Sequence, residues 1–459
     1  MKVGFGKVCI TPPVGFSLVG YFVDRRSEGI MDPLFATSMV IDDGKNLFAL
    51  VSCDLIWIEN EIVKRVKEIV KEKLKIKPKN ISIHATHTHT GPLPSRPDNS
   101  IYTKNFYVDS SYLKILPLLI AESIKVAFKN LKEIEIGFGK SRVEQIAFNR
   151  RYLMKDGRVI TNPFTQKKNI VRSIGEVDDT LYVVVFKGNK NYIGFILNFA
   201  LHPNTIGGNL ISADWPGALR KKIEDEFKCN ALILNGPSGD INHINPLDDT
   251  TRTNKIKEII AEKIFERTKE ILNNIEFKKY ESIKPFFKSF TLNYYPYTKK
   301  DIEKAKEILK SKIPHDSLKY LIATSIINID KQKKKEKKLN LYFNGFSIDK
   351  ELCILTLPGE IFAGIGKKIR ETLPFENIII AQNSNFHLGY IPTKEAFLQH
   401  KNNLKIKPDF DNVCLSEAIG INSSYETLPL ACKVGKNSED IILKSIRTIL
   451  KSIRTLKKY

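Results

Sequence analysis

Short apolar runs, each followed at once by glycine, proline or polar residues, recur along the chain and constrain its fold most strongly. Five of these runs occupy residues 81–85, 193–200, 231–234, 352–357 and 378–381. Runs of this length, bounded by turn-forming residues, are typical of buried strands. Ligands of open α/β sheets bind outside the carboxyl ends of the strands, so the five junctions predict one composite site built from distant segments.

Histidines and carboxylates stand at four of these junctions, namely at His87 and His89, His202, Asp240 and Glu360. Glycine and proline can simply punctuate loops, but that reading does not explain the histidines and carboxylates. In an extended segment His87 and His89 point to the same side, because strand side chains alternate. Neutral imidazole suits zinc. The His-x-His motif alone fixes only two ligands, so a histidine-bearing turn without metal remains open at this point.

The periodicity predicts helices and strands in alternation. Residues 47–52, 60–74 and 81–85 are expected to form a strand, a helix and a second, parallel strand. Further helices are expected at 106–131, 215–227, 254–274 and 437–459, and a hairpin at 181–201. The predicted fold class is therefore α/β, with mixed sheets, flanking helices and a composite metal site at the C-terminal ends of strands.

Domain organisation follows from the absence of a long linker rich in proline or serine. We expect residues 1–459 to form a single catalytic domain. Strands at 286–295 and 339–348 flank a lysine-rich helical insertion around 298–338, within which the dense lysine run 331–338 is expected to be a solvated loop.

The chain is strongly basic, with 73 lysines and arginines against 51 aspartates and glutamates and a formal net charge of +22. Such a charge can indicate nucleic acid or an anionic membrane surface as partner. The lysines lie mostly on amphipathic segments, and we find no zinc-finger, helix-turn-helix or RNP-like pattern. We therefore expect no specific nucleic-acid partner, and only weak association with an anionic membrane surface.

Cysteine usage and the absence of long apolar stretches favour a cytoplasmic protein. The six cysteines are scattered singly without a C-x-x-C motif, which fits a reducing compartment. No stretch approaches about 18 consecutive apolar residues, and the N-terminus has no apolar signal region.

Taken together, seven segments resemble the N-terminal catalytic domain of the neutral/alkaline (non-lysosomal) ceramidase family. They are GIMDPL at 29–34, ATHTHTGP at 85–92, NFALHP at 198–203, ISADWPG at 211–217, GD at 239–240, PGE at 358–360 and the segment 385–393 with its Gly-Tyr pair. No single segment is decisive, but their joint occurrence, in this order, covers nearly the whole chain.

The resemblance implies a zinc ion bound by His87, His202, Glu360 and Tyr390. Two imidazoles and a carboxylate would leave a position for water, the usual arrangement of a catalytic zinc. Zinc would lower the pKa of that water and polarise the scissile carbonyl. His89 is expected to act as a general acid or base, or else to orient His87 or a carboxylate.

Four further residues are assigned by the resemblance or by their place in these segments. Arg150 matches an Asn-Arg segment near the substrate headgroup, although from sequence alone an arginine in this setting is more often a surface residue. Tyr425 matches a Tyr-Glu segment that borders the site. Asp54 and Asp214 are expected to be structural rather than catalytic.

The sequence departs from the family pattern at two positions. Asn242 occupies the place of a serine two residues after the Gly-Asp pair, and Met31 that of a histidine. An amide cannot act as a nucleophilic serine, but it can donate a hydrogen bond to an oxyanion. The C-terminal immunoglobulin-like domain of the longer ceramidases is not expected in this chain.

The leading hypothesis is a zinc-dependent hydrolase that cleaves an amide (N-acyl) bond with a metal-activated water. His89 would move protons, and Asn242 or Tyr425 would help to hold the oxyanion. The substrate is expected to be a small or lipid-like N-acyl compound, but not long-chain ceramide. Two alternatives remain: a metal-free serine hydrolase using Ser238 with a histidine and Asp240, and a non-enzymatic protein that binds an anionic surface or nucleic acid.

Overall fold

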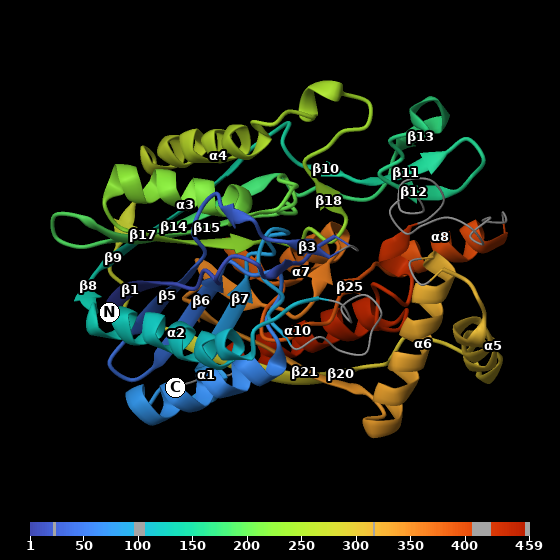
Figure 1. Ribbon diagram of the computed structural model, residues 1–459. Coiled ribbons are helices and arrows are strands. Elements are labelled where there is room, and N and C mark those ends of the chain that lie inside the picture. The colour runs from blue at the N-terminus through green and yellow to red at the C-terminus, as the bar shows by residue number, and fades with distance from the viewer. Residues whose placement is uncertain (22–23, 96–105, 315–316, 406–423, 455–459) are drawn as a thin grey trace.

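The structure is a computed structural model that describes residues 1–21, 24–95, 106–314, 317–405 and 424–454. The first main sheet has the strand order β7-β6-β5-β1-β8. Its strands are β1 (Lys2–Cys9), β5 (Phe35–Asp42), β6 (Leu47–Cys53), β7 (Ile81–Ala85) and β8 (Lys132–Glu133). Only β6 and β7 run parallel in it. The helices α1 (Asn60–Leu74) and α2 (Ser110–Lys129) cover its outer face (Figure 1).

The second main sheet has the order β17-β15-β14-β9-β19 and lies above the first in Figure 1. Its strands are β9 (Glu135–Arg142), β14 (Thr180–Lys187), β15 (Tyr192–Phe199), β17 (Asn230–Asn235) and β19 (Phe277–Lys278). Its one parallel pair, β15 and β17, is connected through α3 (Asp214–Phe227). Together with α4 (Ile256–Leu272), α3 covers the outer face of this sheet.

The third main sheet has the order β20-β21-β22-β24. Its strands are β20 (Lys284–Leu292), β21 (Leu339–Ile348), β22 (Leu352–Thr356) and β24 (Asn377–Ala381). Here β22 and β24 run parallel, with α7 (Ala363–Thr372) between them along the chain. The terminal helix α10 (Ser438–Arg454) packs on β20 and α7. Two further helices, α5 (Lys299–Lys310) and α6 (Leu318–Lys335), lie between β20 and β21 along the chain and pack together.

Short elements shape the loops that connect the sheets. The short strands are β2 (Ser17–Leu18), β3 (Arg25–Arg26), β4 (Gly29–Ile30), β10 (Phe148–Asn149), β11 (Arg151–Met154), β12 (Val159–Thr161), β13 (Ile170–Ser173), β16 (Leu210–Ile211), β18 (Ile241–Asn242), β23 (Glu360–Ile361) and β25 (Tyr390–Ile391). The remaining helical segments are α8 (Lys394–Lys405) and the 3-10 turns η1 (Pro78–Asn80), η2 (Lys167–Asn169), η3 (Asp249–Thr251) and η4 (Tyr425–Thr427).

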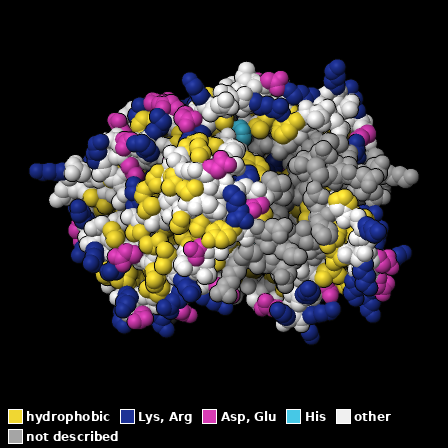
Figure 2. All heavy atoms as spheres, viewed as in Figure 1, with side chains coloured by type: hydrophobic (Ala, Val, Ile, Leu, Met, Phe, Trp, Pro, Cys, Tyr) yellow, Lys and Arg dark blue, Asp and Glu magenta, His cyan; other side chains and the backbone are white. Residues whose placement is uncertain are grey.

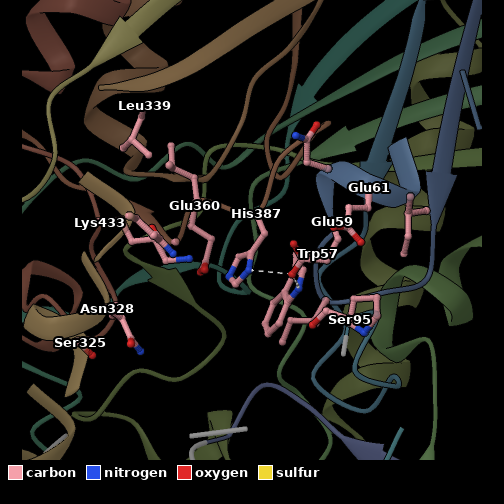
Figure 3. Close-up of a pocket in the computed structure, with 18 of the residues that line it drawn as sticks. Trp57, Glu59, Glu61, Ser95, Ser325, Asn328, Leu339, Glu360, His387 and Lys433 are labelled. Carbon is pink, nitrogen blue, oxygen red and sulfur yellow. Dashed lines mark hydrogen bonds and ion pairs between the residues drawn. The ribbon is translucent and has the colours of Figure 1, made fainter. Parts of the chain in front are cut away.

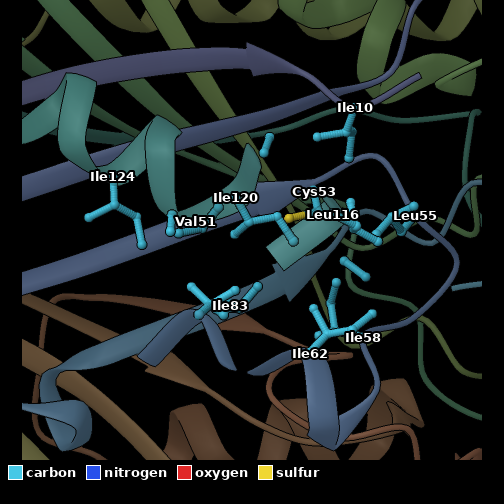
Figure 4. Packing of buried hydrophobic residues seen from close by; sticks show 14 of the residues in the cluster. Ile10, Val51, Cys53, Leu55, Ile58, Ile62, Ile83, Leu116, Ile120 and Ile124 are labelled. Carbon is cyan, nitrogen blue, oxygen red and sulfur yellow. The ribbon is translucent and has the colours of Figure 1, made fainter. Parts of the chain in front are cut away.

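The main sheets share one buried core. Phe5 and Met39 of the first sheet, Val184 of the second, and Phe346 and Ile354 of the third belong to the same apolar cluster. A second cluster fills the space between the first sheet and the helices α1 and α2, where side chains such as Ile83, Ile62 and Ile120 interdigitate (Figure 4). The three sheets are therefore held together by side chains that none of them could bury alone.

The predicted fold class is confirmed: mixed sheets with flanking helices, each main sheet carrying one parallel pair. The expectation of a loop at 331–338 is wrong for its first part, since α6 continues through Lys335. Lysine has a good helix propensity, and the apolar residues of α6 that come before the run already hold the helix in place. The terminal helix is described only to Arg454, so residues 455–459 of that prediction lie outside the described part.

Two further properties concern the described residues alone. The cysteines among them are free thiols, and Cys414 lies outside the described ranges. No helix in these ranges is both long and apolar enough to cross a lipid bilayer.

Lysine and arginine side chains project around the whole outline of the face shown in Figure 2 and do not gather in a single patch.

Candidate metal centre

Three histidines from two sheets meet at the carboxyl ends of parallel strands. His87 and His89 follow β7 of the first sheet, and His202 follows β15 of the second. The Nε2 atom of His87 lies 3.1 Å from Nε2 of His202 and 3.4 Å from Nε2 of His89. All three rings are buried, and their ligand atoms lie within 4.8 Å of one another. The predicted junctions after strands therefore do converge.

The third sheet adds a carboxylate and a phenol. Glu360 begins β23 after β22, and Tyr390 begins β25 after β24, and the two residues are direct partners in a parallel pair. Oε2 of Glu360 lies 3.2 Å from Nε2 of His87 and 3.7 Å from Nε2 of His202. The hydroxyl of Tyr390 is hydrogen-bonded to Glu360. Each main sheet thus contributes at least one residue.

The hydrogen bonds of the rings leave lone pairs facing one another. Nδ1 of His87 lies 2.7 Å from the carbonyl of Ile56, and Nδ1 of His202 lies 3.2 Å from the carbonyl of Ser238. A carbonyl only accepts, so each Nδ1 carries the proton and each neutral ring exposes its Nε2 lone pair. Two such lone pairs 3.1 Å apart, beside a Glu360 oxygen that has no hydrogen-bond donor, form a group of acceptors that a cation between them would satisfy.

His202 and His89 are expected to stay neutral. Burial, the largest cause, holds the pKa of each ring well below the usual range, and the charge of Arg150 adds to it. Burial also opposes ionisation of Glu360, but polar neighbours that include the Arg150 guanidinium and the Tyr390 hydroxyl outweigh it and lower the pKa of that carboxyl. Neutral imidazoles around an ionised carboxylate are a donor set that fits a divalent metal ion.

The backbone at His87 differs from the expected extended geometry. Its φ angle is 76°, in the left-handed region that residues with a side chain seldom occupy. Strand β7 has already ended at Ala85, so strand alternation does not orient the two rings. A sharp turn does so instead, and it brings the rings of His87 and His89 to a centroid distance of 5.0 Å.

A buried arginine organises the two tyrosines. Arg150 is 1% exposed, forms a 3.0 Å ion pair with Glu426 and donates to the carbonyl of Gly239. Its guanidinium lies 5.4 Å from the ring centroids of both Tyr390 and Tyr425. The two hydroxyls are 3.3 Å apart. Arg150 is thus not a surface residue, and it sets the positive potential beside Tyr425.

Asn242 is held away from the predicted role. Its amide nitrogen donates to Asn162 at 2.7 Å, and its amide oxygen accepts from the backbone of Ile244 at 3.1 Å. Ser238 is also engaged: its hydroxyl donates to Asn235 and accepts from Gln382. Neither of these partners is a histidine, so Ser238 lacks the base that a serine nucleophile needs.

The two aspartates expected to be structural bind other parts of the fold. Asp54 forms a bidentate ion pair with Arg220, in which the two terminal guanidinium nitrogens donate to the two carboxylate oxygens at 2.9 and 2.7 Å. Asp214 accepts from the backbone nitrogens of Thr205 and Trp215. Met31, at the position of a family histidine, is 47% exposed.

The cluster lies at one side of a cavity of about 1140 Å³, lined by His87, His89, Glu360, Tyr390 and Tyr425 among others. The cavity also exposes residues that the sequence analysis missed, including Trp57, Glu59, His387 and Lys433 (Figure 3). His387 could have been found, since it lies between the Asn385 junction and Tyr390. Trp57 and Lys433 belong to no sequence motif from which a functional site could be predicted.

Fold and site define an α/β protein whose main sheets deliver histidine, carboxylate and phenol groups to one candidate metal centre. The sequence profile of the family "Neutral/alkaline non-lysosomal ceramidase, N-terminal" matches residues 1–238, and the chain belongs to this family. Membership makes it a hydrolase of the ceramidase type and confirms the resemblance found in the sequence.

Solved structures agree on the fold. The neutral ceramidase from Pseudomonas aeruginosa is 15% identical and superimposes with a TM-score of 0.68 over 98% of this chain and 74% of that one. A structure described as ceramidase complexed with C2 is 14% identical, with a TM-score of 0.68 over 98% of this chain and 75% of that one. At such identities the likeness concerns the fold alone.

Proposed function

We propose that the protein is a zinc-dependent hydrolase that cleaves an amide bond of an N-acyl compound with a metal-activated water. The observation that carries this proposal is the meeting of the His87 and His202 lone pairs with the free Glu360 oxygen. These three residues, with Tyr390, would hold the ion. Zinc there would polarise the scissile carbonyl and supply water with a lowered pKa.

The other residues of the cluster bind and move protons. His89 is a neutral ring whose Nε2 lies 3.4 Å from Nε2 of His87, so it would be placed to take a proton from water at the centre and pass it to the leaving amine. Tyr425 faces the cavity, and burial raises the pKa of its hydroxyl to about 12, so it stays a donor to the developing oxyanion. The occupied amide of Asn242 favours Tyr425 over Asn242 in this role.

We further propose that short, soluble N-acyl compounds are better substrates than long-chain ceramide. The cavity wall formed by α6 contains Ser325, Asn328 and Gln332, spaced along one helix face, beside the apolar Leu321 and Ile329. Such a wall suits a polar substrate more than a second hydrocarbon chain.

We also propose a cytoplasmic location, which the free cysteines of the described residues support.

Metal content tests the centre independently of activity. We expect about one zinc per chain by elemental analysis, lost in His87→Ala and His202→Ala, because each variant leaves only one imidazole among the three remaining ligands. His400→Ala, a partly buried histidine far along the chain on α8, is the matched control and should retain zinc. Zinc retained in full by both cluster variants would contradict the ligand set.

A substrate screen tests the chemistry. Zinc-loaded protein should hydrolyse N-octanoyl amines and amino acids with a higher kcat/KM than long-chain ceramide. Chelation should abolish this hydrolysis, and zinc should restore it. Activity that survives chelation would favour the serine hydrolase instead, and ceramide as the best substrate would contradict the proposed preference.

A further inference from the structure

A second polar cluster lies in the same cavity beside the candidate metal centre. The rings of Trp57 and His387 stack at a centroid distance of 4.0 Å and an angle of 8°. Glu59 accepts from Nε1 of Trp57 at 2.9 Å and lies 3.3 Å from Nδ1 of His387. The ring nitrogens of Trp57 and His387 therefore hold the Glu59 carboxylate in place.

Lys433 brings a cation to this cluster. Its backbone is fixed from both sides, because Cys432 bridges to Gly389 and Val434 bridges to Tyr294. The half-buried side chain points into the cavity, toward Glu360 and His387 (Figure 3). Burial is the main cause of the lowered pKa of His387, and the charge of the nearby Lys433 ammonium adds to it.

The ammonium of Lys433 has no ion pair with a carboxylate of the described chain. The nearby carboxylates have other partners: Glu59 is bound by Trp57 and His387, and Glu360 faces His87 and His202. Once a metal ion occupies the centre, the charge of Glu360 is neutralised there. The ammonium then remains in the cavity wall without a direct ion pair, although its charge also acts on Glu59, and an anion that enters the cavity would be bound favourably there.

We propose that Lys433 binds a carboxylate of the substrate, so that the enzyme acts on N-acyl amino acids in preference to neutral N-acyl amines. This inference rests on the proposed amidase function and names its substrate class. The polar face of α6 supports it, because Ser325 and Asn328 lie on the same side of the cavity as Lys433 (Figure 3). In the reaction the C–N bond breaks, the hydroxyl of water joins the acyl carbon, and the amine takes the proton. The products are a carboxylic acid and an amino acid.

Kinetics on a matched substrate pair tests the assignment. N-octanoylglycine and N-octanoylglycinamide differ only in the terminal group, which is an anionic carboxylate in the first and a neutral carboxamide in the second. Wild type should prefer the glycine by about tenfold in kcat/KM, the contribution expected of one charge-assisted pair. Lys433→Met should abolish this preference mainly through KM, and Lys433→Arg should restore part of it. Lys436→Met, an exposed lysine of the same segment, is the control and should keep the preference.

Binding separates this inference from the proposed function. N-(octylsulfonyl)glycine and its amide carry a sulfonamide in place of the scissile N-acyl bond, so calorimetry on the purified full chain measures recognition alone. Binding of the glycine derivative should weaken about tenfold in Lys433→Met, with little change for the amide derivative. Equal affinities in wild type and Lys433→Met would overturn the role of Lys433, even if hydrolysis were found. Hydrolysis of neither substrate by wild type would overturn the proposed function, while the binding result still decides the role of Lys433.

Discussion

At the scale of single residues, the site is defined by what its buried atoms lack. Nε2 of His87, Nε2 of His202 and Oε2 of Glu360 are acceptors that face one another without a donor. The sequence pointed to the histidines and to Glu360 because each stands directly after an apolar run. It could not reveal that Asn242 is bonded to Asn162, or that His87 has a positive φ angle, because both depend on the packing of segments far apart in the chain.

Asp214 should make stability depend on pH in an unusual direction. Burial outweighs its hydrogen bonds from Thr205 and Trp215 and raises its pKa from 3.8 to about 6. The folded state then holds a proton that the unfolded state releases between these values. The free energy of unfolding should therefore fall by about 3 kcal/mol as the pH rises from 3.8 to 6, and stay level above that.

Urea titrations of wild type and Asp214→Asn at several pH values measure this effect as a difference. The wild-type stability should decline relative to that of the variant across the window from pH 4 to 6. Parallel pH profiles for the two proteins would show that Asp214 keeps an ordinary pKa.

At the scale of elements, the helices and the longer strands could be predicted, whereas the short strands could not. The expected helix at 60–74 matches α1, and the expected strand at 81–85 matches β7. Strands such as β23 and β25 have two residues each, too few for any periodicity. They exist because Glu360 and Tyr390 pair across the loops, and that pairing aligns two of the proposed ligands.

The close approach of α2 to β1 gives a prediction about a single glycine. A Cβ atom added at Gly6 would lie 2.3 Å from the carbonyl oxygen of Ser123 and 2.5 Å from the backbone nitrogen of Ala127. The Gly6→Ala variant must therefore push the helix off the strand, at a cost of about 1–3 kcal/mol. Gly207→Ala is the control, since nothing lies within 4 Å of the added atom. Chemical denaturation checks this, and equal midpoints for the two variants would contradict it.

At the scale of the whole molecule, the main sheets share one apolar core, and this predicts cooperative unfolding. Separate unfolding of any sheet would expose the side chains that the other two bury, such as Phe5, Val184 and Phe346. The single-domain organisation predicted from the sequence has the same consequence. The absence of a linker from the sequence was only weak support for a single domain. The shared core is formed by residues far apart in the chain, and only the fold brings them together.

The two tryptophans report on different parts of this core. Trp215 packs in the cluster beneath α3 and α4, and Trp57 in a cluster near the cavity. Thermal melts of Trp57→Phe and Trp215→Phe, each followed by the fluorescence of the remaining tryptophan, should each coincide with the calorimetric transition of the same variant. A fluorescence transition well separated from the calorimetric one would mean that the sheets unfold independently.

The proposed ligands extend from His87 to Tyr390 along the chain, and this distribution matters for biosynthesis. A nascent chain that ends before Glu360 carries both imidazoles but neither the carboxylate nor the phenol, so it can bind zinc only weakly. Tight capture of the metal must wait until the ribosome has released β25 and the third sheet has formed on the other two. Metal uptake would thus discriminate against translation products that end before Tyr390, and a scarce ion would be committed only to chains that extend beyond that residue.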